Sequence, residues 1–301
     1  MERDAVGLAD FQLSGRELTD PQQSEPELDA RLAALEARLR DLGSLVVAFS
    51  GGADSAFLLA AAARTLGAER VVAATAVSDS LPATELDAAR AFAAGLGVRH
   101  ETVRTHELDR PGYVANAGDR CYFCKAELLD VVGPVAAQLG VSAVATGTNA
   151  DDAVAGFRPG IRAAAERGAL TPLRDAELTK AQIRALSRRW GLVTADKPAA
   201  ACLSSRLAFG VAITPERLQR VERAEADLRR ALVTAGLPVR NLRVRDLGDT
   251  ARVEVDAELV PDVARWDLAA LLPGFAGVEL DPRGFRSGSM NELLPDPVRY
   301  R

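Results

Sequence analysis

Short apolar runs and longer amphipathic stretches alternate along the first two thirds of the chain. Apolar runs predict buried strands over residues 45–49, 70–77 and 141–146, and a polar alternating run predicts a strand at or near a sheet edge over 98–103. Apolar positions at helical spacing predict helices over 26–42, 56–66, 84–95, 124–139 and 179–190. Because strands and helices alternate, we expect an α/β fold in which helices cover both faces of a parallel, twisted sheet.

The pattern changes after residue 198. A long, charged amphipathic helix is expected over 215–235, and short alternating strands are expected over 242–245, 251–255 and 278–280. We therefore predict an α/β domain over residues 26–206 and a small α+β domain over 207–301. Residues 1–25 show no periodicity and are expected to form a flexible tail.

Composition narrows the class of protein. The 301 residues are 48% hydrophobic and 26% charged, as in globular proteins. No apolar run approaches the roughly 20 residues of a membrane span, and the acidic N-terminus lacks the apolar segment of a signal peptide. We expect a cytoplasmic protein without a membrane partner. The net charge of −5 argues against a broad electrostatic grip on nucleic acid, so no nucleic-acid partner is expected.

A glycine loop, SGGADS, joins the first predicted strand to the next helix and begins at Ser50. Gly51 and Gly52 allow backbone amides to approach an anion closely, and the helix N-terminus adds partial positive charge. Ser50 and Ser55 add hydroxyl donors. Asp54 would repel phosphates directly, so we expect it to hold Mg²⁺ that bridges to them.

This loop lacks the lysine of a Walker A motif and the spacing of a dinucleotide fingerprint. An SGGxDS loop after a strand resembles the PP-loop of the ATP pyrophosphatase superfamily. The resemblance implies that ATP is cleaved between its α- and β-phosphates, that a substrate is adenylated and that pyrophosphate is released.

Polar residues also follow the predicted strand over 141–146. Asn149, Asp151 and Asp152 are expected near the adenylation site, because the carboxyl ends of parallel strands meet at one edge of the sheet. Arg158 is a candidate phosphate ligand. The alternatives are a simple polar loop for the first three residues and a turn cap for Arg158.

The three cysteines lie beside these candidate segments. Cys121 and Cys124 form a CxxC that we expect in a loop entering a helix, and Cys202 lies in a separate segment. Structural disulfides are not expected in a cytoplasmic protein. Four interpretations stay open: unrelated thiols, a redox dithiol, a zinc site and an iron–sulfur cluster with one iron open to exogenous sulfide. Zinc would need a fourth ligand, for which His100 and His106 are the only histidines; we expect both to be structural or on the surface.

Two cations stand close to the cysteines in the sequence. Lys125 follows the CxxC directly and is a candidate for contacting the α-phosphate or a substrate carboxylate. Arg206 lies four residues beyond Cys202 and is a candidate for lowering the pKa of its thiol or for binding phosphate. A solvated helix lysine and a surface ion pair are the respective alternatives.

Charged residues of the second domain are weaker candidates. Arg243 and Arg245 share one face of a predicted strand by its period of two, so they could bind a substrate phosphate or form a paired surface. Glu254 and Asp262 are candidates for a second cation site.

Five ordered motifs together resemble the LarE family. They are VVAFSGGADSAFLL (46–59), NAGDRCYFCKAEL (116–128), ATGTNADDAVAGFRPG (145–160), KPAAACLSSRLAFG (197–210) and RGFRSGSMNE (283–292). The family consists of ATP-dependent sulfur transferases that build the nickel-pincer nucleotide cofactor of lactate racemase. The resemblance runs from about residue 28 to 292. It implies pyridinium-3,5-biscarboxylic acid mononucleotide as substrate, a thiocarboxylate product and a homo-oligomer.

The family uses two sulfur sources. Members with only the cysteine that matches Cys202 give up its own sulfur, whereas members with three cysteines bind a [4Fe-4S] cluster and pass on sulfide. This chain has all three. The resemblance therefore implies ATP, Mg²⁺ and a [4Fe-4S] cluster on Cys121, Cys124 and Cys202, with sulfide or another sulfur donor as a partner. Sacrificial use of the Cys202 sulfur stays open.

Three other functions compete. A PP-loop tRNA thiolase would use similar cysteines but is expected to have basic surfaces and further zinc-finger cysteines. An amidotransferase-type NAD or GMP synthetase would not require the three cysteines. A non-catalytic nucleotide-binding or cluster-carrier protein would not turn over ATP.

Overall fold

The computed structural model describes residues 24–294 except 142, 155–157 and 199–200. All but the last two residues of the tail predicted over 1–25 lie outside this range; Glu25 already begins a helix. Within the described part of the chain, no helix is both long and apolar enough to cross a membrane.

A four-stranded parallel sheet forms the centre of the larger part, with strand order β3-β2-β1-β4. The strands are β1 (Leu45–Ala48), β2 (Val71–Val77), β3 (Arg99–Arg104) and β4 (Val144–Thr146). All of β1 is buried, which explains its continuous apolar run. The polar strand β3 lies at the sheet edge, and the α/β fold is as predicted.

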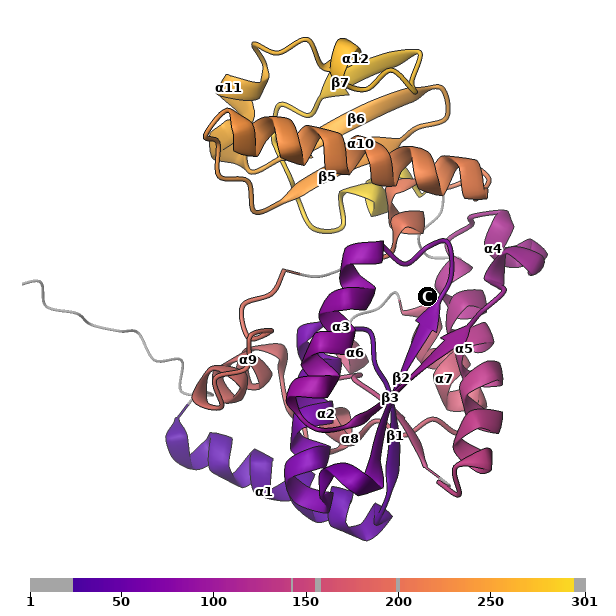
Figure 1. Cartoon of the computed structure of the whole chain (residues 1–301), viewed down its shortest axis with the longest axis vertical. Helices are drawn as coiled ribbons and strands as arrows, with labels where there is room; N and C mark the ends of the chain where they lie inside the picture. Colours follow the sequence, from indigo (N-terminus) through magenta and orange to yellow (C-terminus); the bar gives the residue numbers. More distant parts are fainter. Residues whose placement is uncertain (1–23, 142, 155–157, 199–200, 295–301) are drawn as a thin grey trace, which may run out of the picture.

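Helices cover both faces of this sheet (Figure 1). The long ones are α1 (Glu25–Leu42), α2 (Ala53–Leu66), α3 (Ala83–Gly95), α5 (Arg120–Gln138) and α9 (Lys180–Arg189). Val47 of β1 packs in one core with residues of α1, α2, α3 and α9, whereas Val46 packs on the other face with Val132 of α5. The alternation of side chains along β1 thus divides the helices into two layers.

Two helices begin earlier than the apolar pattern predicts. The helix α2 starts at Ala53, and α5 starts at Arg120, so the CxxC lies in the first turn of α5 rather than in a loop. Polar residues of these first turns line cavities, Asp54 and Ser55 in α2 and Arg120 and Cys121 in α5, so the turns carry no apolar periodicity. Four short helices of the larger part were not predicted from the sequence: α4 (Pro111–Val114), α6 (Ala150–Val154), α7 (Pro159–Glu166) and α8 (Pro172–Asp175).

The C-terminal part places α10 (Pro215–Thr234) on a three-stranded sheet. Its strands are β5 (Leu242–Asp246), β6 (Thr250–Val255) and β7 (Gly277–Leu280), with short helices α11 (Val260–Val263) and α12 (Leu268–Leu271). Single 3₁₀ turns are η2 (Ala68–Arg70), η3 (Glu107–Asp109), η4 (Leu203–Arg206), η5 (Ala257–Leu259) and η6 (Ser289–Leu293). A shared apolar cluster that includes Tyr113, Leu203 and Val221 joins the two parts. The domain boundary at residue 206 stays a prediction.

Candidate functional site

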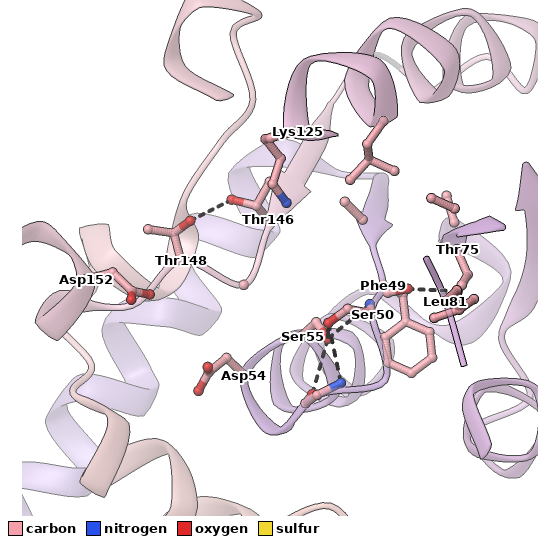
Figure 2. Close-up of a pocket in the computed structure, with 16 residues that line it drawn as sticks. Phe49, Ser50, Asp54, Ser55, Thr75, Leu81, Lys125, Thr146, Thr148 and Asp152 are labelled. Carbon is pink, nitrogen blue, oxygen red and sulfur yellow. Dashed lines mark hydrogen bonds between the residues drawn. The ribbon is translucent and has the colours of Figure 1, made fainter. Parts of the chain in front are cut away.

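The glycine loop lies between the carboxyl end of β1 and the start of α2. Gly51 has a φ of +70°, a conformation that favours glycine. The hydroxyl oxygens of Ser50 and Ser55 lie 3.1 Å apart, and the Ser55 hydroxyl also accepts a bond from the Ser50 amide and donates to the Gly52 carbonyl (Figure 2). These hydrogen bonds fix the turn through its own residues.

Gly147 brings the end of β4 against this loop. A Cβ atom on Gly147 would lie 2.7 Å from the backbone nitrogen of Ser55, closer than real Cβ contacts allow. Only glycine therefore permits this approach. The close contact places the polar residues after β4 beside the glycine loop, as expected for the carboxyl ends of parallel strands.

A cavity of about 290 Å³ opens at this edge of the sheet (Figure 2). It is lined by six of the predicted site residues: Ser50, Gly52, Asp54, Ser55, Lys125 and Asp152. Gly51 and Asn149 are not among its lining residues.

One carboxylate oxygen of Asp54 forms an ion pair, and the other has no partner among the described residues. Its Oδ2 pairs with the ammonium of Lys180, whereas Oδ1 is buried and has no hydrogen-bond partner among the described residues. A buried, unpartnered carboxylate oxygen is costly and is suited to a hard cation. The residues of this cavity therefore fit ATP with Mg²⁺.

Two lysines at the glycine loop were missed by sequence reasoning. Lys180 pairs with Asp54, and Lys197 donates to the Gly51 carbonyl at 3.0 Å and pairs with Glu85 of α3 at 2.6 Å. Both lie more than 120 residues from their loop partners, so no local spacing points to them. Membership of Lys197 in the KPAAACLSSR motif is the signal that could have identified it.

The polar residues after β4 organise the start of α6. The Asn149 amide donates to Asp152 at 3.1 Å, and the Asp152 amide donates back to the Asn149 side chain at 3.2 Å. Asp152 also pairs with the half-exposed Arg158 at 3.4 Å. Asp151 accepts a bond from the Lys180 amide. Asn149 thus supports the loop, while Asp152 faces the cavity.

A second cavity of about 280 Å³ adjoins the first, and Lys125, Thr148 and Asp152 line both. Cys121 and Arg158 line only the second. Lys125 therefore stands at the junction of the two spaces. Burial lowers the pKa of its ammonium, and the neighbouring Cys124 and Cys121 act in the opposite direction.

The three cysteines gather at one end of α5. Cys121 and Cys124 are one turn apart on this helix, and each of the three thiols lies within electrostatic reach of the other two. Part of the Cys121 surface is exposed, but desolvation by the surrounding protein raises the pKa of its thiol. Desolvation raises the pKa of the Cys124 thiol as well. The nearby Cys202 raises both of these pKa values further. Among the described residues, no group of three or more Cys, His, Asp and Glu is arranged to hold a single metal ion.

Arg206 anchors the backbone beside Cys202. Its guanidinium is 4% exposed, pairs with both carboxylate oxygens of Glu225 on α10 at 2.9 and 3.0 Å, and donates to the Cys202 carbonyl at 3.1 Å. The next amide, of Leu203, donates to the Ser80 carbonyl. The segment is therefore tied to both parts of the molecule. The roles predicted for Arg206 in thiol activation or phosphate binding stay predictions.

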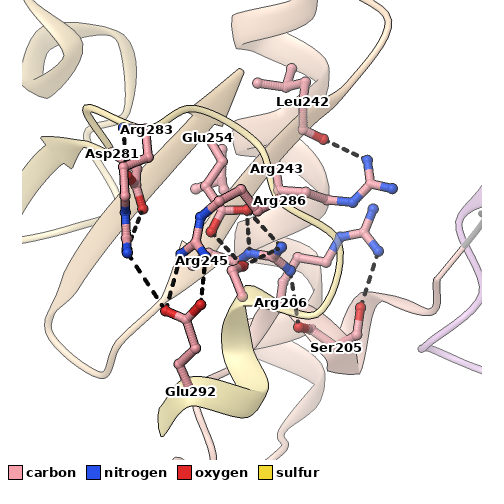
Figure 3. A network of polar contacts seen from close by, with 12 residues as sticks. Ser205, Arg206, Leu242, Arg243, Arg245, Glu254, Asp281, Arg283, Arg286 and Glu292 are labelled. Carbon is pink, nitrogen blue, oxygen red and sulfur yellow. Dashed lines mark hydrogen bonds and ion pairs between the residues drawn. The ribbon is translucent and has the colours of Figure 1, made fainter. Parts of the chain in front are cut away.

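Arg243 and Arg245 lie in a polar network close to the Cys202 segment (Figure 3). Arg245 and Glu254 form a buried ion pair at 2.7 Å, and Glu254 also accepts a bond from Ser289. Burial, with Arg206 nearby, lowers the pKa of Arg243 to about 10. Glu254 therefore already has a cationic partner, and the exposed Asp262 pairs with its neighbour Arg265. Neither acidic residue lines the two cavities.

His100 lines neither of the two cavities, although its partner Thr75 lines the first. Its ring nitrogen shares a hydrogen bond with Thr75 at 2.8 Å, and burial lowers its pKa. His106 lines a smaller cavity beside Tyr113. The structural interpretation of His100 agrees with these contacts.

Comparison with known proteins identifies the family. The asparagine synthase model, which describes a PP-loop ATP pyrophosphatase-type domain, matches residues 28–234. An uncharacterised protein of Synechocystis sp. is 42% identical over 273 residues, covering 89% of this chain and 99% of that protein. The pyridinium-3,5-bisthiocarboxylic acid mononucleotide synthase of Lactiplantibacillus plantarum is 34% identical over 273 residues, covering 89% of this chain and 96% of that enzyme. The chain therefore belongs to the LarE family of ATP-dependent sulfurtransferases, within the PP-loop ATP pyrophosphatases.

Proposed function

We propose that the protein adenylates a carboxylate of pyridinium-3,5-biscarboxylic acid mononucleotide and converts it into a thiocarboxylate. The activity of the L. plantarum relative, a pyridinium-3,5-bisthiocarboxylic acid mononucleotide synthase, supports this substrate. The observation that carries the proposal is the junction at Lys125, where a cavity lined by the glycine loop meets a cavity lined by Cys121. An acyl group activated in the first space would be within reach of sulfur in the second.

In the first step, the glycine loop binds the β- and γ-phosphates, and Asp54 would hold Mg²⁺ against them. A carboxylate oxygen of the substrate attacks the α-phosphorus. The bond from that phosphorus to the bridging oxygen breaks, and pyrophosphate leaves with the electron pair. Lys125 offsets negative charge between carboxylate and phosphate, so positioning and charge neutralisation supply the catalysis.

In the second step, a sulfur nucleophile attacks the acyl carbon. A carbon–sulfur bond forms, the carbon–oxygen bond to AMP breaks, and AMP leaves with that electron pair. Adenylation is needed because a free carboxylate would have to expel oxide. If the nucleophile is the Cys202 thiolate, release of the product breaks its Cβ–S bond, removes the Cα proton and leaves dehydroalanine.

We propose that a [4Fe-4S] cluster on the three cysteines is the sulfur carrier, which the mutual proximity of their thiols supports. In such a cluster each thiolate binds a different iron, so the thiols need not converge on one ion. Burial, with Cys202 nearby, raises the pKa values of the Cys121 and Cys124 thiols, so a bare thiolate is costly here and metal ligation would offset that cost. When bound, the cluster would supply an iron without a protein ligand, at which sulfide can be held.

Anaerobic reconstitution with iron and sulfide tests the cluster. We expect about four irons per chain and broad absorption near 400 nm, both lost in a Cys121→Ser/Cys124→Ser variant. Tyr122→Phe is the matched control, because Tyr122 lies between the two cysteines while its hydroxyl bonds to Glu166. A wild-type protein that binds no iron would exclude the cluster and leave Cys202 as the sacrificial donor.

The reaction itself is tested with ATP, Mg²⁺, the mononucleotide and sulfide. We expect pyrophosphate, AMP and a thiocarboxylate in equal amounts, measured by coupled assay and mass spectrometry. Pyrophosphate release that requires tRNA would instead identify a tRNA thiolase, and release that requires ammonia would identify an amidating synthetase. Absence of any ATP turnover would favour a non-catalytic carrier.

A further inference from the structure

The second cavity combines apolar walls with positive charge. Ile161 and Phe209 contribute apolar surface, and Arg120, Lys125 and Arg158 contribute cations. The helices α5 and α7 both begin at this cavity, so their N-terminal partial charges add to the positive potential. Asp152 is its only acidic lining residue among the described part of the chain, and it pairs with Arg158. Such a space is suited to a flat, apolar body that carries negative charge.

Arg120 is the most constrained cation in this cavity. Its side chain is 7% exposed, and it donates to the Asn116 side-chain oxygen at 2.6 Å. Its guanidinium carbon lies 4.8 Å from the centre of the Phe209 ring. Asn116 has a left-handed backbone conformation, and its side-chain Nδ2 donates to the carbonyls of Ala208 and Val211. The guanidinium is therefore preorganised.

One donor of this preorganised group is unused. The Nε of Arg120 is buried and has no hydrogen-bond partner among the described residues. Leaving such a donor unpaired is costly, and the cost is offset when an acceptor arrives. A carboxylate is the acceptor that matches the planar fork of arginine.

We propose that the second cavity binds the carboxylated aromatic ring of the acyl substrate and that Arg120 binds the carboxylate that is not being adenylated. This inference rests on the proposed function. Lys125, five residues further along α5 at the junction with the ATP cavity, faces the carboxylate that reacts. Because both cations line one cavity, a ring with two carboxylates would place one carboxylate at each cation, and Arg120 would select dicarboxylates over monocarboxylates.

Binding of pyridine-3,5-dicarboxylate tests this inference by calorimetry, with Mg²⁺ and α,β-methylene-ATP present. We expect Arg120→Gln to weaken dicarboxylate binding at least tenfold, which corresponds to about 1.4 kcal/mol. Arg120→Lys should lose less affinity for the dicarboxylate than Arg120→Gln, because lysine keeps the positive charge but lacks the paired N–H donors of the guanidinium. Pyridine-3-carboxylate should bind wild type and Arg120→Gln alike. Arg162→Gln is the matched control, since Arg162 is an exposed arginine of α7 outside the cavity lining.

Binding of α,β-methylene-ATP alone reports on folding in every variant. Phe209→Leu is a second variant, which removes the ring beneath Arg120 but keeps its bond to Asn116, and should weaken dicarboxylate binding several-fold. The inference would be overturned if Arg120→Gln and Phe209→Leu bound the dicarboxylate as tightly as wild type. It would also be overturned if the wild-type protein did not bind the dicarboxylate. If the protein prefers the dicarboxylate as expected but releases no pyrophosphate from ATP when the mononucleotide is present, the proposed function would be overturned and the Arg120 site would stand.

Discussion

A Cys202→Ala variant is expected to form no detectable thiocarboxylate, while still releasing about one pyrophosphate per chain in its first turnover. Cys202 carries sulfur in one route and holds the cluster in the other, so both routes need it. It does not line the cavity of the glycine loop, so the adenylation step should survive. Rapid-quench measurement of pyrophosphate and thiocarboxylate in one reaction separates the two steps.

The Cys121→Ser/Cys124→Ser variant is the companion to this experiment. If the cluster delivers sulfide, this variant should resemble Cys202→Ala. If Cys202 gives up its own sulfur, the variant should complete one turnover, after which the protein lacks the mass of one H₂S. Multiple turnovers by Cys202→Ala with free sulfide would remove Cys202 from the mechanism altogether.

Asp54→Asn is expected to lower kcat/KM for pyrophosphate release by a factor on the order of 10² to 10³, the usual loss for one preorganised electrostatic group. The amide keeps the shape of the side chain but removes the charge that would hold Mg²⁺. Initial rates over a range of Mg²⁺ concentrations measure the effect, and the variant should need more Mg²⁺ for half-maximal rate.

Asp87→Asn provides the control, because Asp87 is an exposed aspartate of α3 whose ion-pair partner is the exposed Arg90. A loss of less than about threefold in Asp54→Asn would contradict the Mg²⁺ role. The function of Asp54 would then be its ion pair with Lys180, and Lys180→Met should reproduce the small loss.

Local patterns in the sequence were sufficient to predict the sheet and the long helices. The buried run of β1 and the polar edge strand β3 are both confirmed, because each depends on neighbouring residues. The first turn of α5 was placed wrongly in a loop. Arg120 and Cys121 of this turn line a cavity, so the turn lacks the apolar periodicity from which a buried helix face is predicted.

Contacts between distant segments could not be predicted in this way. The period of β5 correctly places Arg243 and Arg245 on one face, and the sheet register sets Glu254 opposite Arg243. The carboxylate nevertheless pairs with Arg245, the diagonal neighbour. Lys180 and Lys197 reach the glycine loop only through the packing of the whole domain. The residues with candidate chemistry were found from their motifs, whereas their partners depend on the tertiary structure.

The helix α5 carries Cys121, Cys124 and Lys125 within its first two turns. In the proposed reaction these residues serve different steps, yet a helix moves as one stiff rod with a rise of about 1.5 Å per residue. In that reaction, any tilt of the rod would displace Lys125 and the two cysteines together and would keep the distances between them. Insertion of a single residue between Cys124 and Lys125 would rotate the two groups by roughly a further 100° about the helix axis, and would uncouple ATP consumption from sulfur transfer without removing either group.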